Sequence, residues 1–566
     1  MIITKIRRIL AVAIAIVMVA LVVPVAAPAE TVTTMTAGQT PLTISITIPD
    51  SFEGELNGRV LFMLDHKLPD EGDELFYSLD VTGIPVFGKS VFGLKAGDTI
   101  TMSADDPDVY GYPMQLGEVP SGEYAVQAFF IRYTQFNRQG LPSIWAMADN
   151  GGGGSFVDNP YNLYSDAAVV NLDADDVSLA LSNEIPLGYE LAEGQTEQQG
   201  NYEDTDLVKY IKIKSDLLTE FWGTDMYLGA NVLLPKDYDP AKKYPVLYDQ
   251  GHFADGTAPF NYGRTGRESF ESFTAYWDDG APEMIVVTFR DATPFYDTSY
   301  SVDTASMGPY GQAITTELIP YIEETFGGVG EPWARALSGG STGGWEALAM
   351  QVFYPDMFGG TWPMCPDGVD FHAFQIVNLY EEDNAYYVDN GWTKTERPSA
   401  RDVNGNILWT IKQENNYERA IGGDNDTSLG QWAVWDAVYS PLNEDGYPMH
   451  VWDSLTGDIN PEVVAYWSEH YDLSRILQDN WAELGPKLVG KLHLRGGDMD
   501  NYYLNLAQYI LGDWLETTDD PYYDGYSKTF PRTGHSGNIT NKDLLEEIAA
   551  HMIKYGPQDA AEILGR

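Results

Sequence analysis

The sequence predicts an α/β protein with a doubly wound, mostly parallel sheet, preceded by an all-β, sandwich-like region. Residues 30–180 contain short alternating strand patterns separated by Gly, Pro and Asp clusters, which is typical of a β-sandwich. From residue 207 onward, short apolar strands alternate with helical periodicity, which indicates a layered α/β architecture. The chain has 566 residues, of which 44% are hydrophobic, so it can fill more than one core.

The composition excludes several classes of partner. There are 33 Lys+Arg against 84 Asp+Glu, a net charge of −51, so nucleic acid and anionic membrane surfaces are disfavoured. The single cysteine, Cys365, excludes an intramolecular disulfide framework and a cysteine-based metal cluster. Because the acidity is spread along the chain, it favours a solvated surface suited to salty or calcium-rich surroundings.

The first 29 residues differ from the rest. Three basic residues precede an apolar stretch over residues 9–25, and an A-x-A cleavage site follows at residues 27–29. We therefore expect residues 1–29 to be a signal peptide and the protein to be secreted or periplasmic, with no membrane span after cleavage. The alternative is an uncleaved N-terminal anchor.

Strands are expected throughout residues 30–180. Residues 42–48 alternate strictly, as a half-buried strand should. The other candidates are residues 59–64, 98–102, 124–131 and 167–172. A polar stretch without apolar periodicity follows, and it predicts a linker over residues 181–206.

The catalytic domain is expected over residues 207–566. Its strand candidates are residues 230–234, 244–249, 284–289, 334–337 and 491–495. Its helix candidates are residues 312–326, 345–354, 501–515 and 544–555, and Pro320 should bend the first of them. Residues 366–489 form a long insert that holds half of the chain's 14 tryptophans. These side chains can form the insert's own core, line a cleft for a flat or sugar-like substrate, or do both.

The clearest chemical signal is a G-x-S-x-G motif centred on Ser341, between a strand and a helix. Such a tight turn needs glycines, and it exposes the serine hydroxyl at a helix N-terminus, where negative charge is favoured. We therefore predict Ser341 as the nucleophile. Ser338 is the nearest rival, but it lies on the strand side without flanking glycines.

A serine nucleophile needs a base and an acid that orients it. His535 stands in a loop after the last strand region and before the final helix, where an α/β-hydrolase keeps its base. Asp500 follows a strand and lies between Ser341 and His535 in the chain, as the order of this fold requires. Asp498 is the alternative acid.

Acyl transfer also needs hydrogen-bond donors for the oxyanion. The backbone N–H of Thr342 should supply one. The second should come from the loop after the strand at 244–249, where Gly251 allows the backbone N–H of His252 or Phe253 to turn inward. The His252 ring can also contact substrate.

Residues 207–555 resemble the putative-esterase family of α/β-hydrolases, which includes S-formylglutathione hydrolases (esterase D), feruloyl esterases, enterochelin esterases and mycolyltransferases. The motif at Ser341 carries the likeness, as do residues 230–235, 244–248, 317–322 and 534–536. Members of the family often carry G-x-x-D-x-F/Y at the acid, which Gly497, Asp500 and Tyr502 match. The chain departs from the family at the oxyanion loop, where Gln250-Gly251-His252 replaces the usual His-Gly-Gly.

The expected function is hydrolysis of carboxylic esters, on small molecules or on polysaccharides, without a cofactor. Loops at residues 402–406 and 424–426 carry oxygen ligands that could hold calcium, but ordinary turn chemistry explains them better, so no metal is expected. The alternatives are an acyltransferase or a serine peptidase that uses the same triad, and an inactive polysaccharide- or cell-surface-binding protein. The sandwich could itself be a carbohydrate-binding module.

Overall fold

The computed structural model describes residues 42–566 except 71–72, 173–175 and 253–255. The predicted signal peptide and the candidate donor Phe253 lie outside the described residues. Within the described part, no helix combines the length and the apolar character that crossing a membrane demands.

A mixed sheet of eight strands organises residues 208–530. In spatial order, its strands are β13 (Val208–Ser215), β14 (Met226–Leu233), β16 (Ile285–Arg290), β15 (Val246–Gln250), β19 (Arg335–Gly340), β20 (Gly360–Met364), β25 (His493–Gly497) and β26 (Tyr526–Phe530). β14 pairs antiparallel with both of its neighbours, and all pairs from β16 to β26 are parallel. The carboxyl ends of the parallel strands therefore share one edge.

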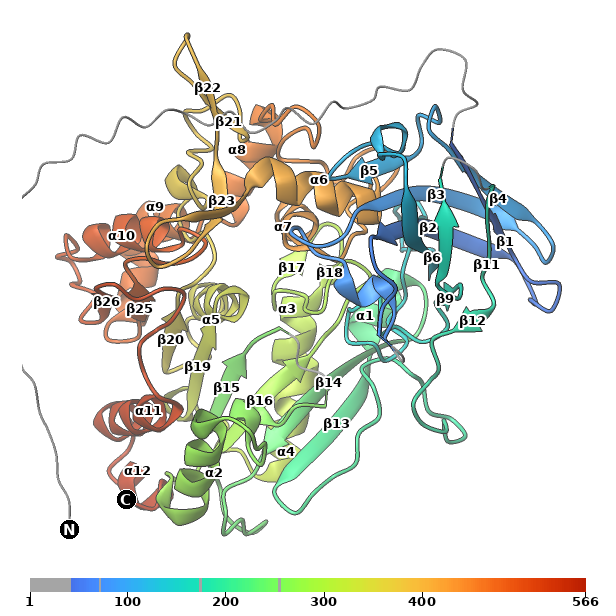
Figure 1. Cartoon of the computed structure of the whole chain (residues 1–566). Helices are drawn as coiled ribbons and strands as arrows, with labels where there is room; N and C mark the ends of the chain where they lie inside the picture. The colour runs from blue at the N-terminus through green and yellow to red at the C-terminus, as the bar shows by residue number, and fades with distance from the viewer. Residues whose placement is uncertain (1–41, 71–72, 173–175, 253–255) are drawn as a thin grey trace, which may run out of the picture. The chain divides into compact units, whose positions relative to one another are not determined.

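Successive residues of the central strands contact different helices. Leu247 of β15 packs with Phe273 and Trp277, whereas its neighbours Val246 and Tyr248 belong to a second apolar core. The first core is covered by α2 (Glu268–Gly280) and α11 (Asn541–Tyr555), which lie side by side in Figure 1. The second core is covered by α1 (Asp216–Trp222), α4 (Ile319–Phe326), α5 (Thr342–Phe353), α9 (Leu473–Leu488) and α10 (Asn505–Leu515). Burial on both faces explains why these strands read as continuous apolar runs.

The predicted bend near Pro320 takes an unexpected form. The helix is built from α3 (Tyr310–Ala313), a π-helical turn η4 (Ile314–Leu318) and α4. Pro320 is the second residue of α4, where its missing N–H costs little. The wider turn before it takes up the change in hydrogen bonding. The helix expected over 501–515 begins only at Asn505, because residues 501–504 form the turn that follows Asp500.

The N-terminal region is β-rich and contains two sheets that share an apolar core. The smaller sheet consists of β11 (Val177–Ala180), β1 (Thr43–Thr47) and β4 (Thr99–Ser103). The larger consists of β12 (Asn183–Glu184), β9 (Leu163–Tyr164), β6 (Glu123–Arg132), β2 (Leu56–Asp65), β3 (Val86–Leu94) and β5 (Tyr110–Tyr112), with β10 (Ala168–Asn171) beside β6. Ile44 of the smaller sheet and Phe62 and Val126 of the larger lie in the shared core.

The insert folds against the rest of the chain. Its elements are β21 (Tyr387–Asp389), β22 (Lys394–Glu396), β23 (Pro398–Arg401), β24 (Ile407–Thr410), α6 (Ile411–Gly422), α7 (Gln431–Tyr439) and α8 (Pro461–His470), followed by α9. Trp432, Trp435, Trp452 and Trp467 lie in the same core as the central sheet, so they form no separate core of the insert. Trp392, by contrast, is 95% exposed on the connection between β21 and β22.

The β-rich region and the insert meet at α6, which Figure 1 shows beside β3 and β5. Arg59 of β2 is 1% exposed and reaches the C-terminus of this helix. Its guanidinium donates to the carbonyl of Ala420 (2.8 and 3.0 Å) and to that of Arg419 (3.1 Å). These are carbonyls of the last helical turn, which have no partner within the helix. Arg59 therefore caps α6 from another part of the chain.

The segment predicted as a linker contains no helix or strand after β12, yet it is bound to the edge of the central sheet. Lys212 of β13 donates to the carbonyls of Thr196, Gln198 and Gly200. All described residues belong to one compact unit. The domain boundaries given above remain predictions.

Replacing Arg59 by alanine should lower the free energy of unfolding by about 2 to 3 kcal/mol, because it leaves the buried carbonyl of Ala420 unpaired, while that of Arg419 keeps the N–H of Gly423. Urea unfolding followed by tryptophan fluorescence would measure this loss. Arg264→Ala is the matched control: this arginine is exposed, and its removal should change stability by less than about 0.5 kcal/mol. Equal losses in the two variants would contradict the capping role.

Candidate active site

Ser341 occupies a strained turn between β19 and α5. Its backbone angles are φ 58° and ψ −124°, a region that residues with a side chain rarely adopt. Its N–H donates to the carbonyl of Met364 on the neighbouring strand β20 (2.9 Å). This turn lies at the carboxyl edge of the parallel strands and aims the Ser341 side chain into a cavity.

Two of the glycines in the motif are required by close packing. A Cβ atom on Gly339 would lie 2.2 Å from the carbonyl oxygen of Gly343, and one on Gly343 would lie 2.2 Å from that of Gln250. A Cβ atom on Gly340 would have its nearest neighbour, the carbonyl of Met364, at 3.9 Å. The requirement for glycine is therefore specific to Gly339 and Gly343.

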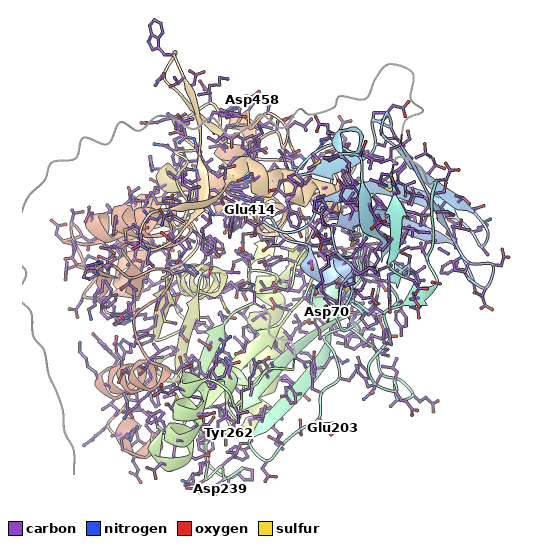
Figure 2. All side chains as sticks on the ribbon, viewed as in Figure 1. Asp70, Glu203, Asp239, Tyr262, Glu414 and Asp458 are labelled. Carbon is purple, nitrogen blue, oxygen red and sulfur yellow. The ribbon has the colours of Figure 1, made fainter. Side chains whose placement is uncertain are left out.

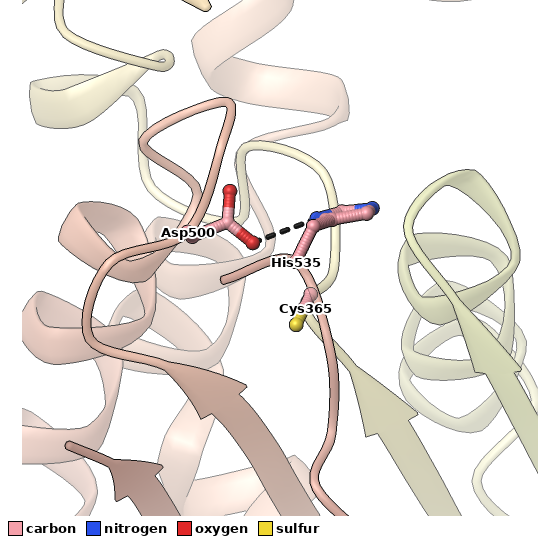
Figure 3. A group of neighbouring side chains, drawn as sticks. All are labelled: Cys365, Asp500 and His535. Atoms are coloured by element: carbon pink, nitrogen blue, oxygen red, sulfur yellow. Dashed lines mark hydrogen bonds and ion pairs between the residues drawn. The ribbon is translucent and has the colours of Figure 1, made fainter. Parts of the chain in front are cut away.

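The structure brings Asp500 and His535 together, as Figure 3 shows. The Nδ1 atom of His535 lies 2.7 Å from Oδ2 of Asp500, which is 1% exposed. The other oxygen, Oδ1, accepts the backbone N–H groups of Tyr502 (2.9 Å) and Leu504 (3.2 Å). Both oxygens of the carboxylate are thus fixed, and one of them faces the imidazole.

The alternative acid, Asp498, does not reach the histidine. Its Oδ1 accepts the backbone N–H of Arg532 (2.6 Å) and so fixes the start of the loop that carries His535. Of the two acids predicted from the sequence, only Asp500 contacts the ring. Ser338, the rival nucleophile, is fully buried and donates to Asp249 (2.6 Å).

The charges around His535 favour its protonated form. Burial alone would lower the pKa of the imidazole, but the hydrogen bond to Asp500 and the negative charges of Asp500 and Asp367 outweigh it. The pKa of His535 is therefore raised above its usual 6.5. An imidazole in this setting accepts a proton readily and is stabilised once it is charged.

A second carboxylate, Asp367, lies at the nucleophile. The Ser341 hydroxyl donates to Oδ1 of Asp367 at 3.5 Å, the long limit of a hydrogen bond, rather than to His535. Oδ2 accepts from Tyr300 (2.8 Å), Thr342 (3.1 Å) and Trp435 (3.3 Å). Burial raises the pKa of Asp367, and these hydrogen bonds and the nearby His535 oppose the rise. In the resting arrangement the serine hydroxyl is thus held by Asp367.

Sequence reasoning missed Asp367, because it was read as the start of the insert. The available signal was an acid shortly after β20, at the same carboxyl edge as Ser341. Its partners could not be found in the same way. Tyr300 and Trp435 come from a buried loop and from α7, both far from Asp367 in the sequence.

The candidate oxyanion donors, Thr342 and His252, lie near Ser341: Thr342 follows it in the chain, and His252 lines the same cavity. Thr342 is the first residue of α5, and the N–H groups of the first helical turn have no partner within the helix. His252 lines the cavity, where its ring lies parallel to that of Tyr296 and its Nδ1 is 3.4 Å from Oδ2 of Asp297. The His252 ring is thus anchored at the wall of the cavity.

One cavity of about 640 Å³ unites these groups. Ser341, His535, His252 and Asp367 line it, together with four aromatic side chains. The aromatic residues are Tyr296, Trp409, Trp435 and Tyr502. Glu414 of α6 adds a second carboxylate, and no Lys or Arg is among the lining residues that the structure describes. Glu414 is half-buried, whereas Asp70, Glu203, Asp239 and Asp458, which Figure 2 also labels, are exposed.

Cys365, Asp500 and His535 also lie close enough together to hold a metal ion (Figure 3). The histidine and the aspartate, however, already form an ordinary hydrogen bond. Burial, with the charge of Asp500, raises the pKa of the Cys365 thiol to about 12. Because a thiol must lose its proton to bind a metal, this environment disfavours a metal site here.

A serine on a tight strand-to-helix turn beside a cavity is typical of α/β hydrolases, and the match to a family model supports a carboxylic ester hydrolase. Residues 223–445 match the family model described as putative esterase. The matched segment includes Ser341 and Asp367 and ends before Asp500 and His535. The resemblance predicted from the sequence is thereby confirmed.

Individual relatives are more distant. The uncharacterized protein YjcH of Bacillus subtilis (strain 168) is 28% identical over 224 residues, which is 37% of this chain and 87% of that protein. Among solved structures, a ferulic acid esterase is similar with 15% identity and a TM-score of 0.34, over 63% of this chain and 98% of its own. S-formylglutathione hydrolase (FrmB) from Staphylococcus aureus is similar with 13% identity and a TM-score of 0.33, over 61% and 99%.

Gly343→Ala should destabilise the protein by about 3 kcal/mol or more, because the added methyl group meets the backbone of Gln250. Gly340→Ala, in the same motif, has room for its methyl group and should stay within about 1 kcal/mol of the wild type. Thermal unfolding of the two variants side by side measures the difference. Similar melting temperatures would show that the close approach at Gly343 is not real.

Proposed function

We propose that the protein is an exported serine esterase in which Ser341, His535 and Asp500 form the catalytic triad. The observation that carries this proposal is the 2.7 Å contact between Asp500 and His535, on the cavity into which the strained turn directs Ser341. An exposed serine, a histidine and a buried acid that orients it are the groups that acyl transfer requires.

In the proposed reaction, the Ser341 hydroxyl turns from Asp367 toward the ring nitrogen of His535 that faces away from Asp500. Its Oγ attacks the ester carbonyl carbon while His535 takes the proton, and a tetrahedral oxyanion forms. The C–O bond to the alcohol then breaks, and His535 returns the proton to that oxygen. A water molecule, deprotonated by the same histidine, releases the acid and regenerates Ser341.

Asp500 and the oxyanion donors lower the barrier. The carboxylate of Asp500 holds the imidazole in one tautomer and stabilises its cation. The Thr342 N–H, at the start of α5, supplies one donor to the oxyanion, and the region of His252 supplies the other. Asp367 adds a second negative charge near the imidazolium and anchors Thr342 and Trp435 on either side of it.

The arrangement of the fold supports the same proposal. Helices on both faces of the sheet, an antiparallel start at β14 and parallel strands from β16 onward fit a doubly wound α/β-hydrolase. The nucleophile, acid and histidine follow β19, β25 and β26 in the chain order expected for that fold.

The cavity indicates the kind of ester. Its aromatic walls suit a flat or apolar group, and its two carboxylates disfavour an anionic one. We therefore propose an uncharged or cationic ester as substrate, either free or linked to a polysaccharide. Export is proposed from the signal-like residues 1–29.

The proposal is tested with p-nitrophenyl esters and three variants. Ser341→Ala should lower kcat by a factor on the order of 10⁴ to 10⁶, because the nucleophile is removed. Asp500→Asn should lower it by about 10³ to 10⁴, because the histidine loses its orienting partner. Asp498→Asn is the matched control and should keep most of the activity, since Asp498 contacts backbone only.

Full activity in Ser341→Ala would show that Ser341 is not the nucleophile. Equal losses of kcat in Asp498→Asn and Asp500→Asn would contradict the assignment of Asp500 as the acid of the triad. Adding an alcohol or an amide substrate to the assay separates the alternatives. Transfer to the alcohol in excess of hydrolysis would identify an acyltransferase, and amide cleavage at comparable efficiency would identify a peptidase.

The pH dependence should report the raised pKa of His535. Because the neutral imidazole is the base, kcat/KM should rise with pH and reach half of its plateau above pH 6.5. Asp500→Asn removes a hydrogen bond and a charge that raise this pKa, so its midpoint should move to lower pH. Steady-state rates over a pH series, with circular dichroism to verify folding, measure both midpoints. A wild-type midpoint below 6.5 would contradict the assigned environment.

A further inference from the structure

A second group of ligand-type side chains lies in the insert, away from the residues that line the catalytic cavity. It consists of Asp426 in the loop after α6, Asp436 on α7 and His450 in the segment before α8. The Nδ1 atom of His450 lies 3.3 Å from Oδ1 of Asp426 and 3.3 Å from Oδ2 of Asp436. Both carboxylates are buried.

These separations fit a shared metal ion better than a direct ion pair. A charge-assisted N–H···O bond is about 2.7–2.9 Å long, and both contacts here are longer. Nitrogen and oxygen ligands that surround Zn²⁺ tetrahedrally, each about 2.1 Å from the ion, lie roughly 3.4 Å from one another. Two of the three separations between ligand atoms thus match an edge of such a tetrahedron, and all three atoms lie within 4.8 Å of one another.

The histidine is oriented as a metal ligand should be. Its other nitrogen, Nε2, lies 3.1 Å from the backbone carbonyl of Asp424. Because a carbonyl can only accept, Nε2 is a donor, so Nδ1, which faces the two carboxylates, is the ring nitrogen that would bind an ion once its proton is lost. A hydrogen bond from the second ring nitrogen to a backbone carbonyl is the usual support of a ligating histidine.

The hydrogen bonding of the two carboxylates also leaves oxygen atoms available to a cation. Oδ1 of Asp436 accepts the backbone N–H of Val451 (2.9 Å), which leaves Oδ2 to face His450. Asp426 is only 9% exposed, and its Oδ2 is buried without a hydrogen-bond partner among the described residues. A buried carboxylate oxygen without a partner is costly, and a bound cation would remove that cost.

Apart from His450 itself, the charged side chains described at this cavity do not supply a cation. Arg419 lines the same small cavity, but its guanidinium donates to Asp424 (2.7 Å). Glu418, also at the cavity, accepts the backbone N–H groups of Trp432 (3.0 Å) and Ala433 (2.9 Å). The cavity measures about 30 Å³, which has room for an ion and about one water molecule.

We propose that Asp426, Asp436 and His450 bind a divalent transition-metal ion, with Zn²⁺ as the best fit. One imidazole and two carboxylates suit zinc, whereas calcium prefers oxygen ligands alone. The ion would join the loop after α6, α7 and the segment before α8. Since α7 carries Gln431 and Trp435, which line the catalytic cavity, the ion would fix one wall of that cavity.

No metal-binding motif marks this site in the sequence, because the three proposed ligands come from separate segments. The loop at 424–426 was read as turn chemistry, and Asp424 indeed serves through its backbone carbonyl rather than as a ligand. The proposal therefore replaces the expectation that the chain binds no metal.

Metal uptake by the full chain tests the proposal. After treatment with a chelator, the protein should take up one equivalent of Zn²⁺ and show a higher melting temperature, as measured by elemental analysis, titration calorimetry and thermal unfolding. His450→Gln and Asp436→Asn should weaken binding on the order of 100-fold. His535→Gln is the matched control, because it removes the histidine of the other His, Cys and Asp group; its zinc binding should equal that of the wild type.

Cobalt substitution of the wild-type protein tests which residues bind the ion, even where a variant fails to fold. Four-coordinate Co²⁺ with nitrogen and oxygen ligands should show visible d–d bands, and it should lack the near-ultraviolet charge-transfer band of a thiolate ligand. No stoichiometric uptake, uptake that is lost in His535→Gln, or a thiolate band that assigns the ion to Cys365 would each overturn the proposal.

Discussion

The active site depends on the backbone of Ser341. A residue with a side chain is held at a positive φ by the tight junction of β19 and α5 and by its hydrogen bond to Met364 on β20. Such a conformation persists only where the surroundings enforce it. Here the enforcement is the contact of Gly343 with the backbone of Gln250 on β15, so three neighbouring strands together determine where the hydroxyl points. The cavity, His535 and the candidate oxyanion donors lie around that hydroxyl.

Two carboxylates share the neighbourhood of one imidazole, but their surroundings differ. Asp500 binds the ring directly and has both oxygens fixed by N–H groups. Asp367 is held by Tyr300, Thr342 and Trp435 and contacts the serine hydroxyl. The first is suited to orient the base. The second links the nucleophile, the oxyanion helix and a wall of the cavity in one buried network, whose members support one another in a low-dielectric setting.

The sequence was informative where the geometry is encoded locally. Gly339 and Gly343 reveal the turn because only glycine fits there, and Asp500 is recognised by its place after a strand. Trp409 and Trp435 line the cavity, as the sequence allowed for tryptophans of the insert. Asp367 and Glu414 were not foreseen, since long-range folding of the insert brings them to the cavity. The contact of Arg59 with Ala420 spans 361 positions, which no local pattern can reveal. The bend expected at Pro320 stays a prediction, and the sequence did not indicate the π-helical turn that precedes this proline.

The cap that Arg59 places on α6 has a consequence for modularity. This helix carries Glu414 at the cavity, and its end leads into the loop of Asp424 and Asp426. The β-rich region therefore stabilises the helix that carries Glu414 at the cavity, so its contribution extends beyond its own fold. A domain that replaced this region, in evolution or in the laboratory, would have to supply its own donor for the carbonyls at the end of α6. Substitutions in β2 that displace Arg59 would then shift α6 and change the shape of the cavity, although no residue that lines the cavity is replaced.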